Sequence, residues 1–143
     1  MPSKEMIGRV LSTGSATVTA EHITAFAAAL GDANPLYEGA EPIAPPTYPI
    51  AFMTQAMAGG MDTFLELGLN FMTLVHGEQE FEYHRTPVAG DVLDGLQKIT
   101  DIYEKESDTA RMTFVVMETV WSDASTSEPV VTERFNLIAR LKK

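Results

Sequence analysis

The sequence predicts one α+β domain in which an antiparallel sheet curls around a buried helix. Residues 49–67 are apolar on nearly every side, which is typical of a helix enclosed by other elements. Segments with strand character follow this helix, and polar turns separate the later ones at residues 105–108 and 122–128. Such short turns indicate hairpins, because a parallel crossover needs about a dozen or more residues. A helix followed by hairpins therefore favours an antiparallel sheet packed on that helix.

Length and composition support a single folded domain. The chain has 143 residues, of which 45% are hydrophobic and 21% are charged, and these values exclude a long disordered, collagen-like or coiled-coil chain. Cysteine is absent, which excludes disulfide frameworks and cysteine nucleophiles and fits a reducing compartment. Residues 1–10 lack an apolar core of signal-peptide length, and polar residues interrupt segment 49–67. We therefore expect a cytoplasmic protein with no membrane span.

The charge balance narrows the range of partners. The chain has 20 acidic and 10 basic residues, giving a net charge of -10 and a pI near 4.6. A polyanion has little electrostatic reason to dock on such a surface, so we expect no nucleic-acid partner. The 3 histidines are scattered and supply no ligand spacing, so we expect no metal site.

The sequence near the amino terminus predicts a strand followed by a helix. Residues 7–18 are rich in β-branched residues and predict a strand. Thr19 is a candidate helix N-cap, and Gly31 is a natural stop for the helix that follows it. The apolar face of this helix is expected to consist of Ile23, Phe26, Ala27 and Leu30.

A long irregular loop follows at residues 31–49. Five of the 8 prolines lie in it, and they exclude helix at most positions. Loops longer than about 12–15 residues in a compact domain are usually functional or disordered. Apolar residues that would anchor the loop favour an ordered functional one, and these are Leu36, Tyr37, Ile43 and Tyr48.

Strand patterns fill the second half of the chain. Apolar and polar residues alternate from residue 72 onward, where His76 shares its parity with Glu78 and Glu80. This alternation predicts a solvated histidine, whereas a β-bulge at Gly77 would turn His76 inward. Three further strands are expected at residues 91–103, 110–121 and 129–141.

Four segments together carry a resemblance to a known family. They are FAAALGDANPLY at residues 26–37, APPTYP at 44–49, HGEQEFEYHRTPVAGD at 76–91 and VVTERFNLIAR at 130–140. This pattern resembles the MaoC-like acyl-thioester hydratases and dehydratases of the hot-dog superfamily, and in particular their amino-terminal-type domain. The resemblance implies one hot-dog domain over residues 1–143, with a curved antiparallel sheet wrapped around a central helix.

The catalytic motif of that family is present with one replacement. In the R-specific enoyl-CoA hydratases it reads Gly-Asp-x-Asn-Pro-x-His, and Gly31, Asp32, Asn34 and Pro35 match it. Tyr37 occupies the histidine position, and a phenol is a poor base at neutral pH because its ordinary pKa is about 10. The resemblance implies that amino-terminal-type domains lack this histidine and bind the acyl chain while a partner half supplies the catalytic pair. The chain is then either an accessory subunit or an enzyme with altered machinery.

Asp32 and His76 are the candidate catalytic residues. Asp32 would orient water or act as an acid, although a Gly-Asp-x-Asn-Pro turn also forms when Asp and Asn bond local amides. His76 is the candidate replacement base, because imidazole has an ordinary pKa near neutrality. Its plainer interpretation is a solvated histidine among carboxylates. A backbone amide at the start of the central helix would stabilise an enolate.

Residues of the loop are candidate substrate contacts, namely Asn34, Tyr37, Pro46, Thr47 and Tyr48. Tyr37 would donate a hydrogen bond to the thioester oxygen, whereas Asn34 also fits a structural role in the turn. Four methionines of the central stretch are expected either to pack in the core or to line an acyl tunnel. These are Met53, Met57, Met61 and Met72. Five basic residues would either bind a phosphate of the substrate or be simply solvated. These are Arg85, Lys98, Arg111, Arg134 and Arg140.

These observations predict an acyl-thioester-binding hydro-lyase, either an (R)-3-hydroxyacyl-CoA/ACP dehydratase or an enoyl hydratase, active alone or with a catalytic partner. One alternative is a non-catalytic acyl-binding subunit. Another is a hot-dog thioesterase in which Gln55, Asp62 or Glu66 serves the attacking water. No cofactor is expected beyond the coenzyme A or acyl-carrier phosphopantetheine of the substrate, and coenzyme A is preferred. The resemblance implies that two protomers form a continuous sheet, in a homo-oligomer or in a heterodimer with a His-bearing subunit.

Overall fold

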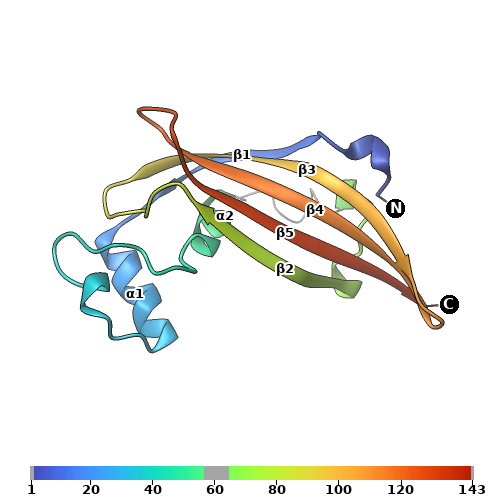
Figure 1. Ribbon diagram of the computed structural model, residues 1–143, viewed down its shortest axis with the longest axis horizontal. Helices are drawn as coiled ribbons and strands as arrows, with labels where there is room; N and C mark the ends of the chain where they lie inside the picture. The colour runs from blue at the N-terminus through green and yellow to red at the C-terminus, as the bar shows by residue number, and fades with distance from the viewer. Residues whose placement is uncertain (1, 57–64, 143) are drawn as a thin grey trace.

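One antiparallel sheet of 5 strands dominates the molecule (Figure 1). The strands are β1 (Val10–Thr17), β2 (Leu74–Tyr83), β3 (Val92–Glu106), β4 (Ala110–Asp123) and β5 (Pro129–Lys142). Their order across the sheet is β1-β3-β4-β5-β2, and each neighbouring pair is antiparallel. The computed structural model describes residues 2–56 and 65–142. The predicted α+β class, the antiparallel sheet and the hairpins that join β3 to β4 and β4 to β5 are confirmed.

Helix α1 (Ala20–Leu30) begins and ends at the residues that the sequence indicated. The Thr19 hydroxyl accepts a hydrogen bond of 3.2 Å from the His22 amide, which satisfies one of the free amides at the helix start. Gly31 has a left-handed backbone with φ of 70°, and this conformation ends the helix. Ile23 is buried, but Leu30 is 56% exposed, so its expected place on the apolar face is wrong. The last turn of α1 extends away from the sheet (Figure 1).

Helix α2 (Ile50–Ala56) lies against the sheet, behind the strands in Figure 1. It is the first part of the helix expected over residues 49–67, and residues 65–66 are again helical. Part of that expectation lies outside the described residues, namely the statements on Met57, Met61 and Asp62. Met53 packs against the core as expected, whereas Met72 is 88% exposed and is not a core residue. Among the described residues, no helix is long and apolar enough to cross a membrane.

Short 3-10 helices connect these elements, namely η1 (Lys4–Met6), η2 (Pro35–Tyr37) and η3 (Phe71–Thr73). The core divides into two clusters along the strands. The loop-end cluster contains an edge-to-face chain of rings with centroid separations of 5.4, 5.6 and 5.3 Å, formed by Phe26, Tyr48, Phe52 and Trp121. Each such pair adds about 0.5–1.5 kcal/mol beyond the burial of its area. The far cluster includes Ile99, Val115, Met117 and Phe135.

Strand β2 forms one edge of the sheet and contains a β-bulge. His76 pairs with Leu137, but Glu78 pairs with Asn136, so the register slips by one residue at Gly77. Glycine fits this position, because a Cβ on Gly77 would lie only 2.2 Å from Oδ1 of the Asn136 side chain. Side chains of β5 therefore occupy the space beside Gly77.

Because of the bulge, the side chains of β2 before Gly77 point to the opposite faces from those that simple alternation predicts. The His76 ring lies 5.6 Å, between centroids, from the ring of the buried Phe135, so His76 lies on the inner face. Val75 takes the outer face instead and is 53% exposed. The expectation that His76 shares a face with Glu78 is therefore wrong, because an extra residue inverts the side-chain alternation. His76 is nevertheless exposed, as the plainer interpretation of a solvated histidine predicted.

Candidate functional site

The turn that follows α1 is held by its own side chains. Oδ1 of Asp32 accepts a hydrogen bond of 3.1 Å from the Asn34 amide, and Oδ1 of Asn34 accepts one of 3.0 Å from the Leu36 amide. The Asp32 amide donates to the Ala27 carbonyl at 3.0 Å. Asp32 is exposed, and Asn34 is half-buried. Local bonds therefore use one oxygen of each side chain and leave the second carboxylate oxygen of Asp32 outside the turn.

Tyr37 occupies the position where the motif has a histidine, and its side chain belongs to the core. It is 7% exposed and packs in the loop-end cluster. Its carbonyl accepts a hydrogen bond of 3.0 Å from the Thr24 hydroxyl of α1, which fixes η2 against the helix. Leu36, one of the expected anchors, points outward and is 58% exposed. Within this short helix Tyr37 alone therefore anchors the loop.

The second half of the loop presents both exposed and buried candidates. Pro46 and Thr47 are exposed, and the Pro46 carbonyl accepts a hydrogen bond from the Tyr83 hydroxyl, which fastens the loop to the end of β2. Burial and the Glu133 carboxylate raise the pKa of Tyr83 to about 12, so this phenol is a neutral donor near pH 7. Tyr48 is completely buried, and its hydroxyl has no hydrogen-bond partner among the described residues. Burial raises the pKa of Tyr48 as well.

The amides at the start of α2 are already hydrogen-bonded. The amides of Ile50, Ala51 and Phe52 donate to carbonyls three residues earlier, at 3.3, 2.8 and 2.9 Å. These donors are therefore occupied in the described chain. The expectation that an amide here stabilises an enolate gains no support from this geometry.

Asp32 and His76 lie far apart in one chain. Asp32 follows the end of α1, whereas His76 lies near the start of β2, and Figure 1 shows these two elements separated along the long axis of the molecule. The clusters agree with this separation, because Tyr37 packs in the loop-end cluster and His76 contacts Phe135 of the far cluster. One chain therefore does not bring the two candidates together as an acid–base pair.

The residues of the thioesterase alternative do not form a described site. Glu66 is exposed and pairs with Arg9 at 2.7 Å. The Gln55 side chain and Asp62 lie outside what the structure describes. Within the described ranges, no group of three or more His, Asp or Glu side chains is arranged to hold a metal ion.

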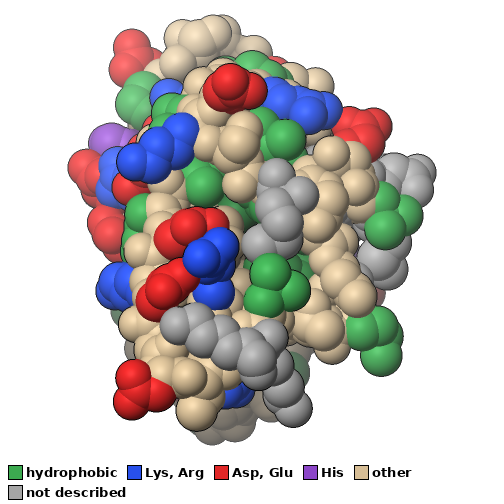
Figure 2. Space-filling view, turned by 90° about the vertical axis from the view of Figure 1, so that its right-hand side faces the viewer, with side chains coloured by type: hydrophobic (Ala, Val, Ile, Leu, Met, Phe, Trp, Pro, Cys, Tyr) green, Lys and Arg blue, Asp and Glu red, His purple; other side chains and the backbone are tan. Residues whose placement is uncertain are grey.

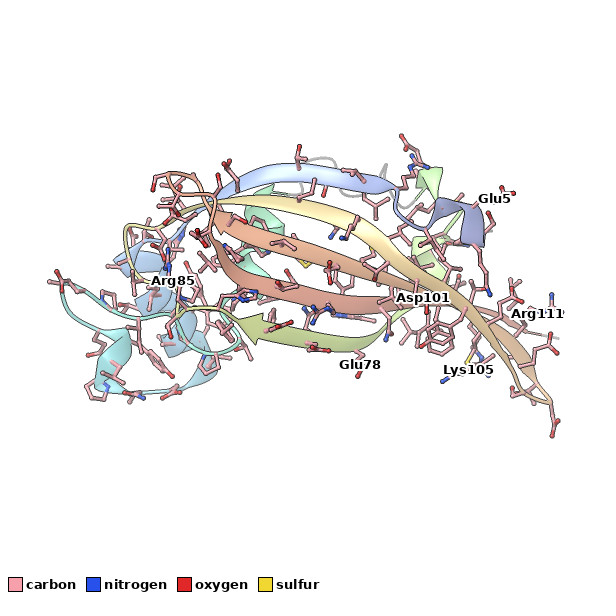
Figure 3. The ribbon with its side chains drawn as sticks, turned by 45° about the horizontal axis from the view of Figure 1, so that its top comes forward. Glu5, Glu78, Arg85, Asp101, Lys105 and Arg111 are labelled. Atoms are coloured by element: carbon pink, nitrogen blue, oxygen red, sulfur yellow. The ribbon has the colours of Figure 1, made fainter. Side chains whose placement is uncertain are left out.

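Most of the candidate phosphate-binding residues are paired with carboxylates. The pairs are Arg85 with Asp91 and Asp123, Lys98 with Glu118, Arg111 with Glu106, and Arg134 with Glu80, Glu82 and Glu118. Arg85 and Arg111 also lie at opposite ends of the molecule (Figure 3). Figure 2 shows acidic and basic side chains interspersed on one end of the molecule, without a single basic patch on that face. These residues therefore do not gather into a phosphate site.

A row of buried polar side chains on the inner face was missed in the sequence. Nε2 of Gln97 donates to Oγ1 of Thr119 at 3.2 Å. Glu133 has no exposed surface and accepts hydrogen bonds from Nε2 of Gln79 at 2.8 Å and from Nε1 of Trp121 at 3.3 Å. Burial raises the pKa of Glu133, although these two donors oppose the change. The row spans four neighbouring strands beneath α2.

Side-chain parity could have revealed Glu133. It lies two residues from Val131 and two from Phe135, so the three side chains share the inner face of β5, where the other positions are apolar. A carboxyl at an inward position of a predicted strand indicates a buried polar contact.

The chain is similar in sequence to a known family of domains. Residues 5–133 match the family described as FAS1-like, dehydratase domain region. The chain therefore belongs to this family, which has the MaoC-like hot-dog fold. The expected family resemblance and fold are confirmed.

Individual proteins agree with this assignment. The UPF0336 protein of Thermobifida fusca is 42% identical over 94 residues, which span 59% of this chain and 61% of that protein. The matched stretch thus covers less than two thirds of that relative. A chain of the truncated HadBC (3R-hydroxyacyl-ACP dehydratase) complex from Mycobacterium tuberculosis is 19% identical with a TM-score of 0.75, covering 94% of this chain and 97% of that one. A MaoC-like dehydratase from Phytophthora capsici is 20% identical with a TM-score of 0.73, covering 99% of this chain and 52% of that one. Both structures show the likeness of fold.

Proposed function

We propose that this chain is the acyl-thioester-binding subunit of an (R)-3-hydroxyacyl dehydratase or enoyl hydratase, and that a partner subunit supplies the catalytic histidine. One observation carries the proposal. Tyr37 occupies the histidine position of the motif and is packed in the loop-end cluster. The candidate replacement base, His76, is too far along the sheet to work with Asp32 of its own chain.

The similar proteins support a site shared between two halves. The mycobacterial neighbour is one chain of a HadBC complex. The chain covers only 52% of the Phytophthora neighbour, so its fold corresponds to about half of that longer protein. A single hot-dog unit that lacks the motif histidine fits one half of such an arrangement.

The loop supplies the residues for binding the thioester. The second oxygen of Asp32 is free of the turn and would orient water or the histidine of the partner. Pro46 and Thr47 are exposed later in the same loop and would contact the acyl group. The buried Tyr48 hydroxyl has no hydrogen-bond partner among the described residues and would donate to a thioester oxygen. The substrate would be a coenzyme A or acyl-carrier thioester, no other cofactor would be needed, and the protein would act in the cytoplasm.

The free edge of β2 offers a place for the partner. Among the described residues, this strand pairs with β5 on one side and with no strand on the other. Apolar side chains are exposed on and beside it, including Met72, Val75 and Tyr83. A second hot-dog unit would extend the sheet across this edge.

Binding and turnover of crotonyl-CoA test the proposal. We expect the purified chain to bind crotonyl-CoA by calorimetry without loss of the enoyl absorbance and without release of free thiol. Asp32→Ala and His76→Ala serve as matched variants. If the chain alone consumed the enoyl signal and both variants lost this activity, it would be a self-sufficient hydratase and the proposal would be wrong. Thiol release with an unchanged enoyl signal would make it a thioesterase.

A further inference from the structure

We infer that the free edge of β2 selects a different subunit whose own edge strand is basic on the outer face, and that it disfavours pairing with a second copy of this chain. The inference rests on the proposed function, in which a partner subunit completes the site. It adds the chemistry by which that partner is recognised.

The outer face of β2 carries a carboxylate at every second residue. Glu78, Glu80 and Glu82 occupy successive outward positions after the bulge. The Glu80 and Glu82 side chains are 59% and 51% exposed. Figure 3 shows Glu78 at the β2 edge of the sheet, where its Oε2 accepts a hydrogen bond of 3.2 Å from Nδ2 of Asn136 on β5. Any strand that extends the sheet here meets this acidic row.

Two copies of this chain oppose like charges when they pair over residues 78–82 of β2. Antiparallel pairing centred on Glu80 places Glu80 opposite its own copy and Glu78 opposite Glu82. A register shift that keeps the two outer faces matched moves the strands by two residues. Such a shift still places Glu80 opposite either Glu78 or Glu82. Like charges directly opposite each other destabilise a strand pair.

Neighbouring cations in the chain do not neutralise the row. Arg134 is the basic residue that contacts it, and its guanidinium is shared among Glu80, Glu82 and Glu118. Glu118 also pairs with Lys98 at 3.4 Å. The surface around β2 is therefore acidic even after its ion pairs are formed. The net charge of -10 adds a long-range repulsion between two copies.

A basic strand meets none of these obstacles. Lys or Arg at alternate outward positions would face Glu78, Glu80 and Glu82, and opposite charges across a strand pair are favourable. The exposed Val75 and Tyr83 supply apolar contact at the two ends of the row. The competing explanation is that an acidic edge strand serves only to prevent aggregation. That explanation predicts no association with a basic strand.

A charge-reversed form of this chain provides a defined basic partner. We expect the wild type and Glu78→Lys/Glu80→Lys/Glu82→Lys each to remain monomeric alone, because each strand repels its own copy. In an equimolar mixture the two should form a heterodimer at low salt, with a Kd at least about ten-fold below that of either homodimer. High salt should weaken it, because charges across the edge are screened. Sedimentation velocity at low and high salt measures all three samples.

Two further variants complete the test. Glu38→Lys/Glu41→Lys/Glu128→Lys changes the net charge equally at exposed sites away from β2 and should not dimerise with the wild type. Glu78→Gln/Glu80→Gln/Glu82→Gln keeps the side-chain shapes and should self-associate more strongly than the wild type. A salt-insensitive wild-type homodimer, an unassociated mixture, equal binding by the control, or no gain in the glutamine variant would each overturn the inference. None of these measurements uses a thioester, so their failure and the failure of acyl binding are separate results.

Discussion

Nε1 of Trp121 donates a hydrogen bond of 3.3 Å to Oε2 of Glu133, a carboxyl with no exposed surface. Burial raises the pKa of Glu133 above its ordinary value of 4.5, although the donors Trp121 and Gln79 oppose this. The folded protein therefore holds this proton to a higher pH than the unfolded chain does. As the pH rises above 4.5, the unfolded chain loses the proton first, so the free energy of unfolding falls until the folded pKa is passed.

We expect Glu133→Gln to remove this part of the pH dependence. The introduced amide cannot ionise, and the Gln79 amide can rotate to offer its Oε1, which is buried and has no partner among the described residues. The stability of the variant relative to the wild type should therefore rise with pH above 4.5. Urea unfolding of both proteins over a pH series measures the difference. A difference that stays constant with pH would contradict the buried carboxyl.

Gly95→Ala should destabilise the protein. A Cβ on Gly95 would lie 2.5 Å from Cζ3 of Trp121, closer than real Cβ contacts allow. The Trp121 ring cannot easily move, because it packs edge-to-face on Phe52 at 5.3 Å. Overpacking of this kind costs about 1–3 kcal/mol. Urea unfolding gives the loss, and the same change in a Trp121→Leu background should cost less because the clash is gone.

Removal of the Tyr48 hydroxyl and removal of the Tyr83 hydroxyl should change the stability in opposite directions. Tyr48→Phe removes a buried hydroxyl with no partner among the described residues and should stabilise the protein by about 1 kcal/mol. Tyr83→Phe removes the donor to the Pro46 carbonyl and should destabilise it by about the same amount. Thermal unfolding measures both variants. If the Tyr48 hydroxyl also binds the thioester, Tyr48→Phe should weaken crotonyl-CoA binding while raising Tm, and weaker binding with a lower Tm would indicate a packing role.

Tyr37→His should give the chain enoyl hydratase activity. The change completes Gly-Asp-x-Asn-Pro-x-His with Asp32, and an imidazole titrates near neutrality, as a general base requires. We expect loss of the crotonyl-CoA absorbance at least about ten-fold above the wild-type background, since general-base catalysis contributes about 10²–10⁴-fold. Adding Asp32→Ala to this variant should abolish the gain. A folded Tyr37→His protein without turnover would show that the turn does not hold Asp32 in a catalytic position.

The sequence by itself determined the features that depend on neighbouring residues. Thr19 marks the start of α1 and Gly31 marks its end, because capping and left-handed backbone are local properties. The strands and hairpins followed from alternation and turn residues, and the replacement of the motif histidine by Tyr37 was visible directly. These features need no knowledge of which strands lie side by side.

Only the tertiary structure decided the properties that depend on strand pairing. The bulge at Gly77 turned His76 to the inner face, and it is a property of the pairing of β2 with β5, where the Asn136 side chain lies beside Gly77. Burial of Glu133 beside Trp121, and the position of β2 at a free edge, follow from the strand order of the sheet. The separation of Asp32 from His76 has the same origin, because residues distant in sequence meet only where the fold packs their elements together.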